Sequence, residues 1–177
     1  MAPSSIEERL LLACARGERP AAPGGLDWDR LLSYAARQRL MPALCWGLGG
    51  SDGVPMNVGE RLRRAFQETA RRNLLLAGEL LELLELFAGR GVRAIPFKGP
   101  VLAAALYGDL ARREFFDLDL LIRLEDLGAA QEVLESRGYR LTSNLNWTQQ
   151  ANIRKWNFEL LFARDDGCSI EIGRAHV

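Results

Sequence analysis

The hydrophobic pattern changes at Gly91, and this change constrains the fold more than any other feature of the chain. Before Gly91, apolar residues recur at helical spacing in four segments separated by loops that contain Gly or Pro. These predicted helices are residues 6–16, 27–40, 43–48 and 58–88, with Asp27 and Asn57 as the expected N-caps of the second and the last. The first half of the chain is therefore predicted to be helical.

After Gly91, short apolar runs alternate with short helical segments. Strands are predicted at residues 92–97, 117–122, 139–142, 157–164 and 168–172, and helices at 100–107, 124–137 and, less clearly patterned, 144–155. Asp165-Asp166-Gly167 is typical of the turn of a β-hairpin. This order predicts an α+β fold, in which a small mixed sheet with packed helices follows a helical N-terminal region.

Composition excludes several classes of function. Lys+Arg and Asp+Glu both number 23, a balance that argues against a non-specific nucleic-acid binder. No apolar run approaches the roughly 18–20 residues of a membrane span. Three widely spaced cysteines predict a reducing, cytoplasmic setting without a disulfide framework or a zinc site. The one histidine, His176, leaves almost nothing for a catalytic triad or a histidine metal site.

Asp117 and Asp119 are the sharpest candidates for chemistry. Side chains two residues apart on a strand project from the same face, so both carboxylates point one way while Leu118 and Leu120 pack on the other side. Two converging carboxylates repel each other unless a cation lies between them, and Mg²⁺ prefers such oxygen ligands. Acidic residues at a strand end are also commonly solvated, and the spacing alone does not decide between these interpretations.

A second candidate lies upstream, where Lys98-Gly99 joins a predicted strand to a helix that begins with Pro100. A helix N-terminus carries backbone N–H groups and a partial positive charge that suit phosphate, and Lys98 adds a full charge there. An ordinary turn with an exposed lysine fits the same residues. Arg113, four residues before Asp117, can either hold a triphosphate or neutralise the aspartates.

These residues together resemble the uncharacterised bacterial nucleotidyltransferase family of the DNA-polymerase-beta-like superfamily. The family's usual form is an LKG turn, a tyrosine, an arginine and a (G)DxDLLV strand. The matching stretches here are Phe97-Lys98-Gly99, Leu106-Tyr107-Gly108-Asp109, Arg113, Phe116–Ile122 and Gly138-Tyr139. The helical first half is similar as well, so the likeness spans nearly the whole chain.

The resemblance implies a two-metal, Mg²⁺-dependent transfer of a nucleoside monophosphate from an NTP to an unknown acceptor. Asp117, Asp119 and a third carboxylate, matched by Glu171, would be catalytic and hold the ions. Lys98, Gly99 and Arg113 would bind the phosphates. One departure from the superfamily is that its Gly-Ser phosphate signature is Gly99-Pro100 here, which removes a hydroxyl and an amide donor.

The resemblance also bears on the end of the chain, because family members continue beyond Glu171. Residues 172–177 match one reading frame of a common sequencing adapter, which predicts a truncated metagenomic gene with these six residues as an artefact. The predicted organisation is residues 1–90 helical, 91–171 an incomplete nucleotidyltransferase-like core, and 172–177 adapter-encoded. On this interpretation the last strand lies at an unprotected edge, and residues 172–177 add little stability.

Two other functions remain open from the sequence. A catalytically inactive nucleotide- or partner-binding protein would keep the same fold without turnover. A plain helical interaction module fits the first half, but it leaves the Lys98-Gly99 turn and the Asp117–Ile122 strand without a purpose.

Overall fold

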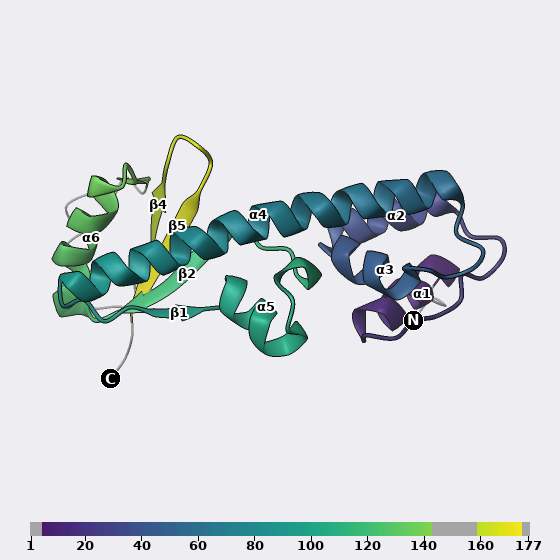
Figure 1. The fold of residues 1–177 in the computed structure, drawn as a ribbon, viewed down its shortest axis with the longest axis horizontal. Helices are drawn as coiled ribbons and strands as arrows, with labels where there is room; N and C mark the ends of the chain where they lie inside the picture. The colour runs from purple at the N-terminus through teal and green to yellow at the C-terminus, as the bar shows by residue number, and fades with distance from the viewer. Residues whose placement is uncertain (1–4, 143–158, 175–177) are drawn as a thin grey trace. The chain divides into compact units, whose positions relative to one another are not determined.

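The computed structural model describes residues 5–142 and 159–174, which form six α-helices and a five-stranded mixed sheet (Figure 1). This architecture confirms the predicted α+β class and its helical N-terminal region. The chain divides into two compact units, one of residues 1–73 and 107–114, the other of residues 74–106 and 115–177. The division falls inside the long helix α4, Met56–Gly89, whereas the sequence pattern changes at Gly91.

The first unit is built from α1 (Ile6–Ala15), α2 (Trp28–Arg37), α3 (Met41–Leu48) and the first part of α4. Side-chain N-caps begin the first two of these helices. Ser5 and Glu8 form a reciprocal capping box at α1. The Asp27 side chain accepts a hydrogen bond from the backbone N–H of Arg30, 3.0 Å away, which confirms it as the cap of α2. Asn57 is not the cap predicted for α4, because this helix already begins at Met56.

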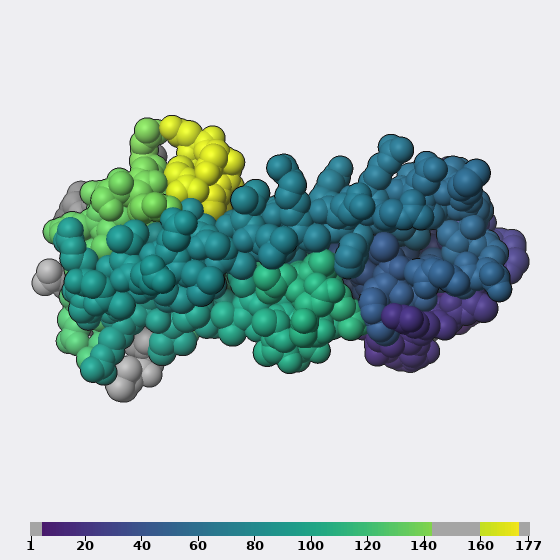
Figure 2. Space-filling view, in the orientation of Figure 1, coloured from purple at the N-terminus to yellow at the C-terminus, as the bar shows by residue number. Residues whose placement is uncertain are grey.

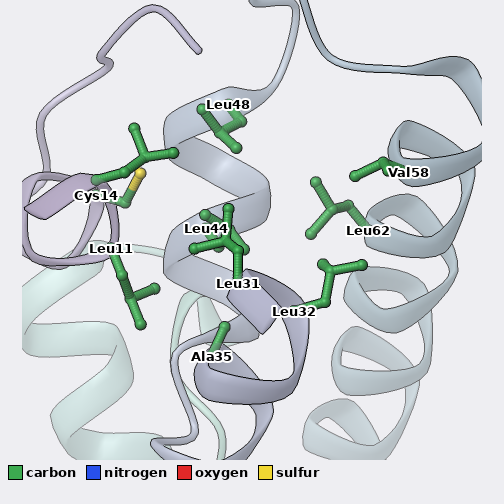
Figure 3. Close-up of a cluster of buried hydrophobic side chains, with 10 residues drawn as sticks. Leu11, Cys14, Leu31, Leu32, Ala35, Leu44, Leu48, Val58 and Leu62 are labelled. Atoms are coloured by element: carbon green, nitrogen blue, oxygen red, sulfur yellow. The ribbon is translucent and has the colours of Figure 1, made fainter. Parts of the chain in front are cut away.

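Leucines at helical spacing form the core of the first unit (Figure 3). Leu11 and Cys14 of α1, Leu31 of α2, Leu44 of α3 and Leu62 of α4 project toward a common centre. Burial raises the pKa of the Cys14 thiol to about 11, so this sulfur is a packing group and not a reactive thiolate.

The second unit is organised around the sheet, whose strand order is β1-β2-β5-β4-β3. The strands are β1 (Ile95–Phe97), β2 (Asp117–Ile122), β3 (Arg140–Leu141), β4 (Glu159–Ala163) and β5 (Ser169–Arg174). β2 and β5 are parallel, and every other pair is antiparallel. The hairpin predicted around Asp165-Asp166-Gly167 joins β4 to β5. The helix predicted for residues 144–155 lies outside the described residues.

One face of the sheet is the core of the second unit. Its side chains are fully or nearly fully buried: Leu118, Leu120 and Ile122 of β2, Ile170 and Ile172 of β5, and Leu160 and Phe162 of β4. The second part of α4 and α6 (Leu127–Ser136) contribute further buried residues to this unit, among them Leu83, Phe87 and Leu134. Because strand side chains alternate, the residues between the buried ones must point to the opposite face.

Glu79 of α4 is the polar centre of the second unit. Its carboxylate accepts hydrogen bonds from Tyr139 Oη at 3.0 Å, Arg164 Nη1 at 2.9 Å and Arg137 Nη2 at 3.3 Å. Burial on its own raises the pKa of Glu79, but the hydrogen bonds and charges of these partners together hold it below its ordinary value. The Glu79 carboxylate therefore connects α4 to Arg137, which follows α6, to Tyr139, which precedes β3, and to Arg164, which follows β4.

The prediction that the last strand lies at an exposed edge is wrong. β5 is the central strand of the five, paired with β2 on one side and β4 on the other. Ile172 is completely buried, and Gly173 and Arg174 continue the pairing with β2. The sequence pattern identified a strand here but could not tell which strands would flank it. Residues 172–174 are thus part of the sheet, contrary to the expectation that they add little stability.

Replacing Ile172 by Ala should lower the free energy of unfolding by about 2–5 kcal/mol, since the side chain is fully buried in the core face. Leu161→Ala is the matched control, because this leucine of β4 is 43% exposed and should cost well under about 1 kcal/mol. Urea unfolding measures both. Equal effects of the two substitutions would contradict the central placement of β5.

Glu79→Gln should lower the free energy of unfolding at pH 7 by roughly 2 kcal/mol, because it removes the charge that three donors share. The pKa of Glu79 is lower in the folded protein than in the unfolded chain. The ionised carboxylate therefore stabilises the fold fully at pH values above the ordinary carboxyl pKa, and this stabilisation is lost as the pH falls through the pKa of the folded protein. The variant should therefore lose less stability than the parent as the solution is acidified below about pH 5. Glu125→Gln, which removes only an exposed contact with Arg123, should leave that acid dependence unchanged.

Candidate active site

Three carboxylates lie on the face of the sheet opposite the core. Asp119 of β2 is paired in register with Glu171 of β5, and Asp117 is paired with Ser169. Because β2 and β5 are parallel and aligned at these positions, the three acidic side chains leave the sheet on the same side. The structure thus brings Glu171 together with Asp117 and Asp119, which lie far before it in the chain.

Lys98 supplies the positive charge at this face. Its Nζ lies 3.0 Å from Oδ1 of Asp119, whose side chain is only 5% exposed, while the lysine side chain is 50% exposed. The hydrogen bond to Asp119 is the main cause that raises the pKa of Lys98, and the charges of Asp119, Glu171 and Asp117 add to it. A single ammonium group therefore responds to all three carboxylates, which identifies this face as a region of concentrated negative charge.

The Lys98-Gly99 turn has an unusual backbone conformation. Lys98 has φ of 55° and Gly99 has φ of 40°, so two successive residues adopt left-handed conformations between β1 and α5 (Gly99–Tyr107). This conformation is unfavourable for a non-glycine residue, and such strain is usually kept where the side chain must point in a particular direction. Here the direction is toward Asp119. An added Cβ at Gly99 would come within 3.5 Å of the Asp117 carbonyl oxygen, an ordinary contact.

The donor atoms at this face suit a hard divalent cation, because Mg²⁺ is held by carboxylate oxygens. Across residues 5–142 and 159–174, however, no three acidic, thiol or imidazole groups converge closely enough to form a metal cluster. Asp119 is instead directed to the Lys98 ammonium, a cation of the protein's own. The three carboxylates thus suit a cation in donor chemistry and in strand register, although in this arrangement they do not converge on one point and Asp119 is paired with the Lys98 ammonium.

Arg113 belongs to the first unit, whereas the carboxylates belong to the second. It follows a short 3₁₀ turn, Leu110–Arg112, and its carbonyl oxygen accepts a hydrogen bond from Nδ2 of Asn73, 2.7 Å away. The neighbouring Arg112 stacks on Trp46, with its guanidinium carbon 3.9 Å from the ring centroid. The role predicted for Arg113 at phosphate stays a prediction.

Asn73 is a residue that the sequence reasoning missed. It is fully buried in α4, and its side-chain amide donates to the carbonyl oxygens of both Leu110 and Arg113, at 2.6 and 2.7 Å. It thus fixes the loop that precedes β2 in the chain. The sequence could have identified Asn73, because it lies at a position where the helical spacing of the apolar residues of α4 predicts a buried apolar side chain.

A comparison with known protein families gives the class of protein to which the chain belongs. The model of a family described as uncharacterised nucleotidyltransferase matches residues 24–175. The chain belongs to this family. The match confirms the part of the resemblance that names an uncharacterised nucleotidyltransferase family, and it supports a general role in nucleotidyl transfer. All six candidate site residues of this nucleotidyltransferase-family chain lie inside the matched range, which also extends beyond Ile172.

The helices formed by the described parts of this family member have no apolar stretch of the length that a membrane span needs.

Proposed function

We propose that this chain is a Mg²⁺-dependent nucleotidyltransferase that moves a nucleoside monophosphate from an NTP to an acceptor hydroxyl. The observation that carries the proposal is the register of β2 against β5, which aligns Asp119 with Glu171 and leaves Asp117 on the same face. The family to which the chain belongs supports nucleotidyl transfer as the class of reaction.

Asp117, Asp119 and Glu171 are the residues that would hold the divalent ions. Bound there, Mg²⁺ would neutralise and polarise the triphosphate oxygens as charge develops during transfer. The burial of Asp119 matters for this role, since a carboxylate that is withdrawn from water interacts more strongly with a cation. In the ligand-free protein the same property makes Lys98 necessary, because a buried carboxylate needs a positive partner.

Lys98 would exchange Asp119 for a phosphate oxygen when the nucleotide binds. The lysine side chain is half exposed and flexible, so its ammonium can move without disturbing the core. The N-terminus of α5 begins at the next residue and offers backbone N–H groups with a partial positive charge to the same phosphate. Pro100 has no backbone N–H group and no hydroxyl, so it cannot donate to the phosphate as the serine of a Gly-Ser turn would. Lys98 would therefore contribute more to phosphate binding here.

The transfer step forms a bond from the acceptor oxygen to the α-phosphorus and breaks the bond from that phosphorus to the bridging oxygen, releasing pyrophosphate. The proton of the acceptor hydroxyl would pass to a carboxylate oxygen of Glu171, which is partly exposed on the reacting face. Arg113 would add charge to the triphosphate, as the resemblance implies.

Asp117→Asn combined with Asp119→Asn should abolish the rise in melting temperature that Mg²⁺ and an NTP together produce, because the ion-binding oxygens lose their charge. Folding should persist, since Asn keeps the shape of Asp and its amide oxygen can still accept a hydrogen bond from Lys98. Thermal shift with Mg²⁺ and each NTP in turn measures this. Asp165→Asn, on an exposed aspartate paired with Arg140, is the matched control and should retain the full shift. A normal shift in the double variant would mean that the ion site is elsewhere.

Lys98→Ala should weaken NTP binding by about tenfold or more while affecting Mg²⁺ binding less, because the lost ammonium contacts phosphate. Lys98→Arg should restore binding only in part, since a planar guanidinium replaces a point charge in a tight turn. Titration calorimetry separates the two ligands. Arg93→Ala, which removes one exposed positive charge elsewhere in the second unit, should leave both affinities unchanged.

A catalytically inactive nucleotide-binding protein is the second candidate, and the Lys98–Asp119 ion pair favours it, because that pair already satisfies the buried carboxylate. Transfer of labelled nucleotide onto candidate acceptors distinguishes the two functions. An active enzyme should lose about 10²-fold or more in rate with Glu171→Gln while still binding the nucleotide. An inactive one would bind Mg²⁺ and NTP without product in either form.

A further inference from the structure

The first unit contains a cavity of about 450 Å³ between the end of α3 and the start of α4. Its wall is formed by α3, by the loop of residues 49–55 and by the first turns of α4. The space-filling view shows this part of the chain, in blue, at the surface of its unit (Figure 2). Small-molecule pockets measure roughly 300–1,000 Å³, whereas packed protein interiors leave few voids larger than a water molecule. The cavity is therefore too large to be an ordinary gap in packing.

Apolar side chains contribute to the lining of this cavity from all three segments. Leu48 of α3 and Leu62 of α4 are buried, and they lie on the sides of their helices that face each other (Figure 3). Val54 of the loop is half-buried and adds to the same lining. A ligand that covers these groups removes apolar surface from water, which favours binding. The cavity thus suits a molecule with an apolar body.

Arg63 brings a positive charge to the wall of the cavity. The two neighbouring arginines of α4 are engaged: Arg61 lies 2.7 Å from Asp29, and Arg64 lies 3.8 Å from Glu60. Among the residues that the structure describes, no carboxylate forms an ion pair with Arg63. Its guanidinium group is therefore available to an anion that enters the cavity.

Cys45 shows that the charge of Arg63 acts inside the cavity, because both residues line it. Burial raises the pKa of the Cys45 thiol, and the positive charge of Arg63 opposes this rise. An anion beside Cys45 would interact with the same charge. Apolar groups around it exclude water, so the interaction would be screened less than at an open surface.

Gly59 is a glycine of α4 that also lines the cavity. It is part of the helix, since its backbone N–H donates to the carbonyl oxygen of Pro55 at 2.9 Å. A Cβ at Gly59 would meet no atom within 4 Å, so packing within the chain does not require glycine here. Alanine is more favourable than glycine in a helix, and the close approach of a ligand is one reason to keep a glycine.

We propose that this cavity binds a small organic monoanion, a molecule with an apolar body and one acidic group. The body would pack on Leu48, Val54 and Leu62, and the acidic group would accept charge-assisted hydrogen bonds from Arg63. Glu60 lies in the same wall, so a second negative charge on the ligand would be repelled. All the lining residues belong to the first unit, and the proposal is independent of the proposed function.

Two fluorescent probes that differ only in charge test the proposal. Anilinonaphthalene sulfonate has an apolar body and one anionic group, and phenylnaphthylamine is the same body without the sulfonate. Fluorescence titration of the full chain should show a saturable site that binds the sulfonate at least about tenfold more tightly than the neutral probe, because only the sulfonate can bond to Arg63. Equal affinities, or no saturable binding of the sulfonate, would overturn the proposal.

Arg63→Gln should weaken the binding of the sulfonate by about tenfold and leave the affinity for the neutral probe unchanged. Arg71→Gln is the matched control, because Arg71 is an exposed arginine of the same helix that does not line the cavity. It should leave both affinities unchanged. Equal losses in the two variants, or no loss with Arg63→Gln, would contradict the assigned role of Arg63.

Gly59→Leu should weaken the binding of both probes by about tenfold or more, because the new side chain occupies part of the cavity. Gly78→Leu is the matched control: Gly78 also lies in α4, a Cβ there would meet no atom within 4 Å, and it is outside the cavity. Unchanged binding in a folded Gly59→Leu variant, or the same loss in both variants, would place the probe elsewhere.

Cys45 provides a test that needs no substitution. The bound sulfonate should slow the alkylation of Cys45 by iodoacetamide at least about threefold, followed by peptide mass spectrometry, because the probe covers the thiol in the cavity wall. Cys168, a half-buried cysteine of the second unit, should react at an unchanged rate. Protection of neither cysteine, or equal protection of both, would overturn the proposal.

Discussion

The parallel pairing of β2 with β5 is the constraint on which the candidate site depends. Side chains on a strand alternate, so a slip of one residue in this pairing would turn the carboxylates into the core and the isoleucines out of it. Leu118 and Leu120 on one strand and Ile170 and Ile172 on the other are all fully buried, which fixes the register. The same hydrophobic interactions that stabilise the sheet therefore align Asp119 with Glu171. A single alternating pattern therefore encodes both the acidic face and the apolar core.

The local parts of this arrangement were predictable from the sequence. The β2 strand has the bounds expected from its alternation, 117–122, and the Lys98-Gly99 turn, the Asp27 cap and the β4–β5 hairpin lie where the residues indicated. Each of these features depends on residues within a few positions of one another, and their conformational propensities can be read directly from the sequence. Glu171 could be placed on the face opposite Ile170 and Ile172 for the same reason, although its functional role rested on the resemblance and remains a proposal.

The non-local parts were not predictable in this way. A strand's own pattern does not say whether it lies at the centre or the edge of a sheet, and β5 proved central because β2, far earlier in the chain, pairs with it. Asn73 and Glu79 were likewise overlooked, since their partners lie between 37 and 85 positions away. The boundary predicted at residue 90 followed the change in pattern, whereas the chain's contacts divide inside α4. Organisation into separate domains at residue 90 stays a prediction.

The ion pair of Lys98 with Asp119 links the stability of the second unit to its proposed chemistry. A carboxylate as buried as Asp119 would be costly if unpaired, and Lys98 adopts a left-handed backbone conformation in the turn that brings its ammonium group to that carboxylate. A cation that binds Asp119 would have to displace this ammonium. Breaking the ion pair costs free energy, so the cation would bind less tightly than it would to an unpaired carboxylate. In the proposed mechanism, the displaced ammonium would become available to a phosphate oxygen at the same turn. Metal and nucleotide would then bind cooperatively, because each provides the charge that the other's arrival leaves uncompensated.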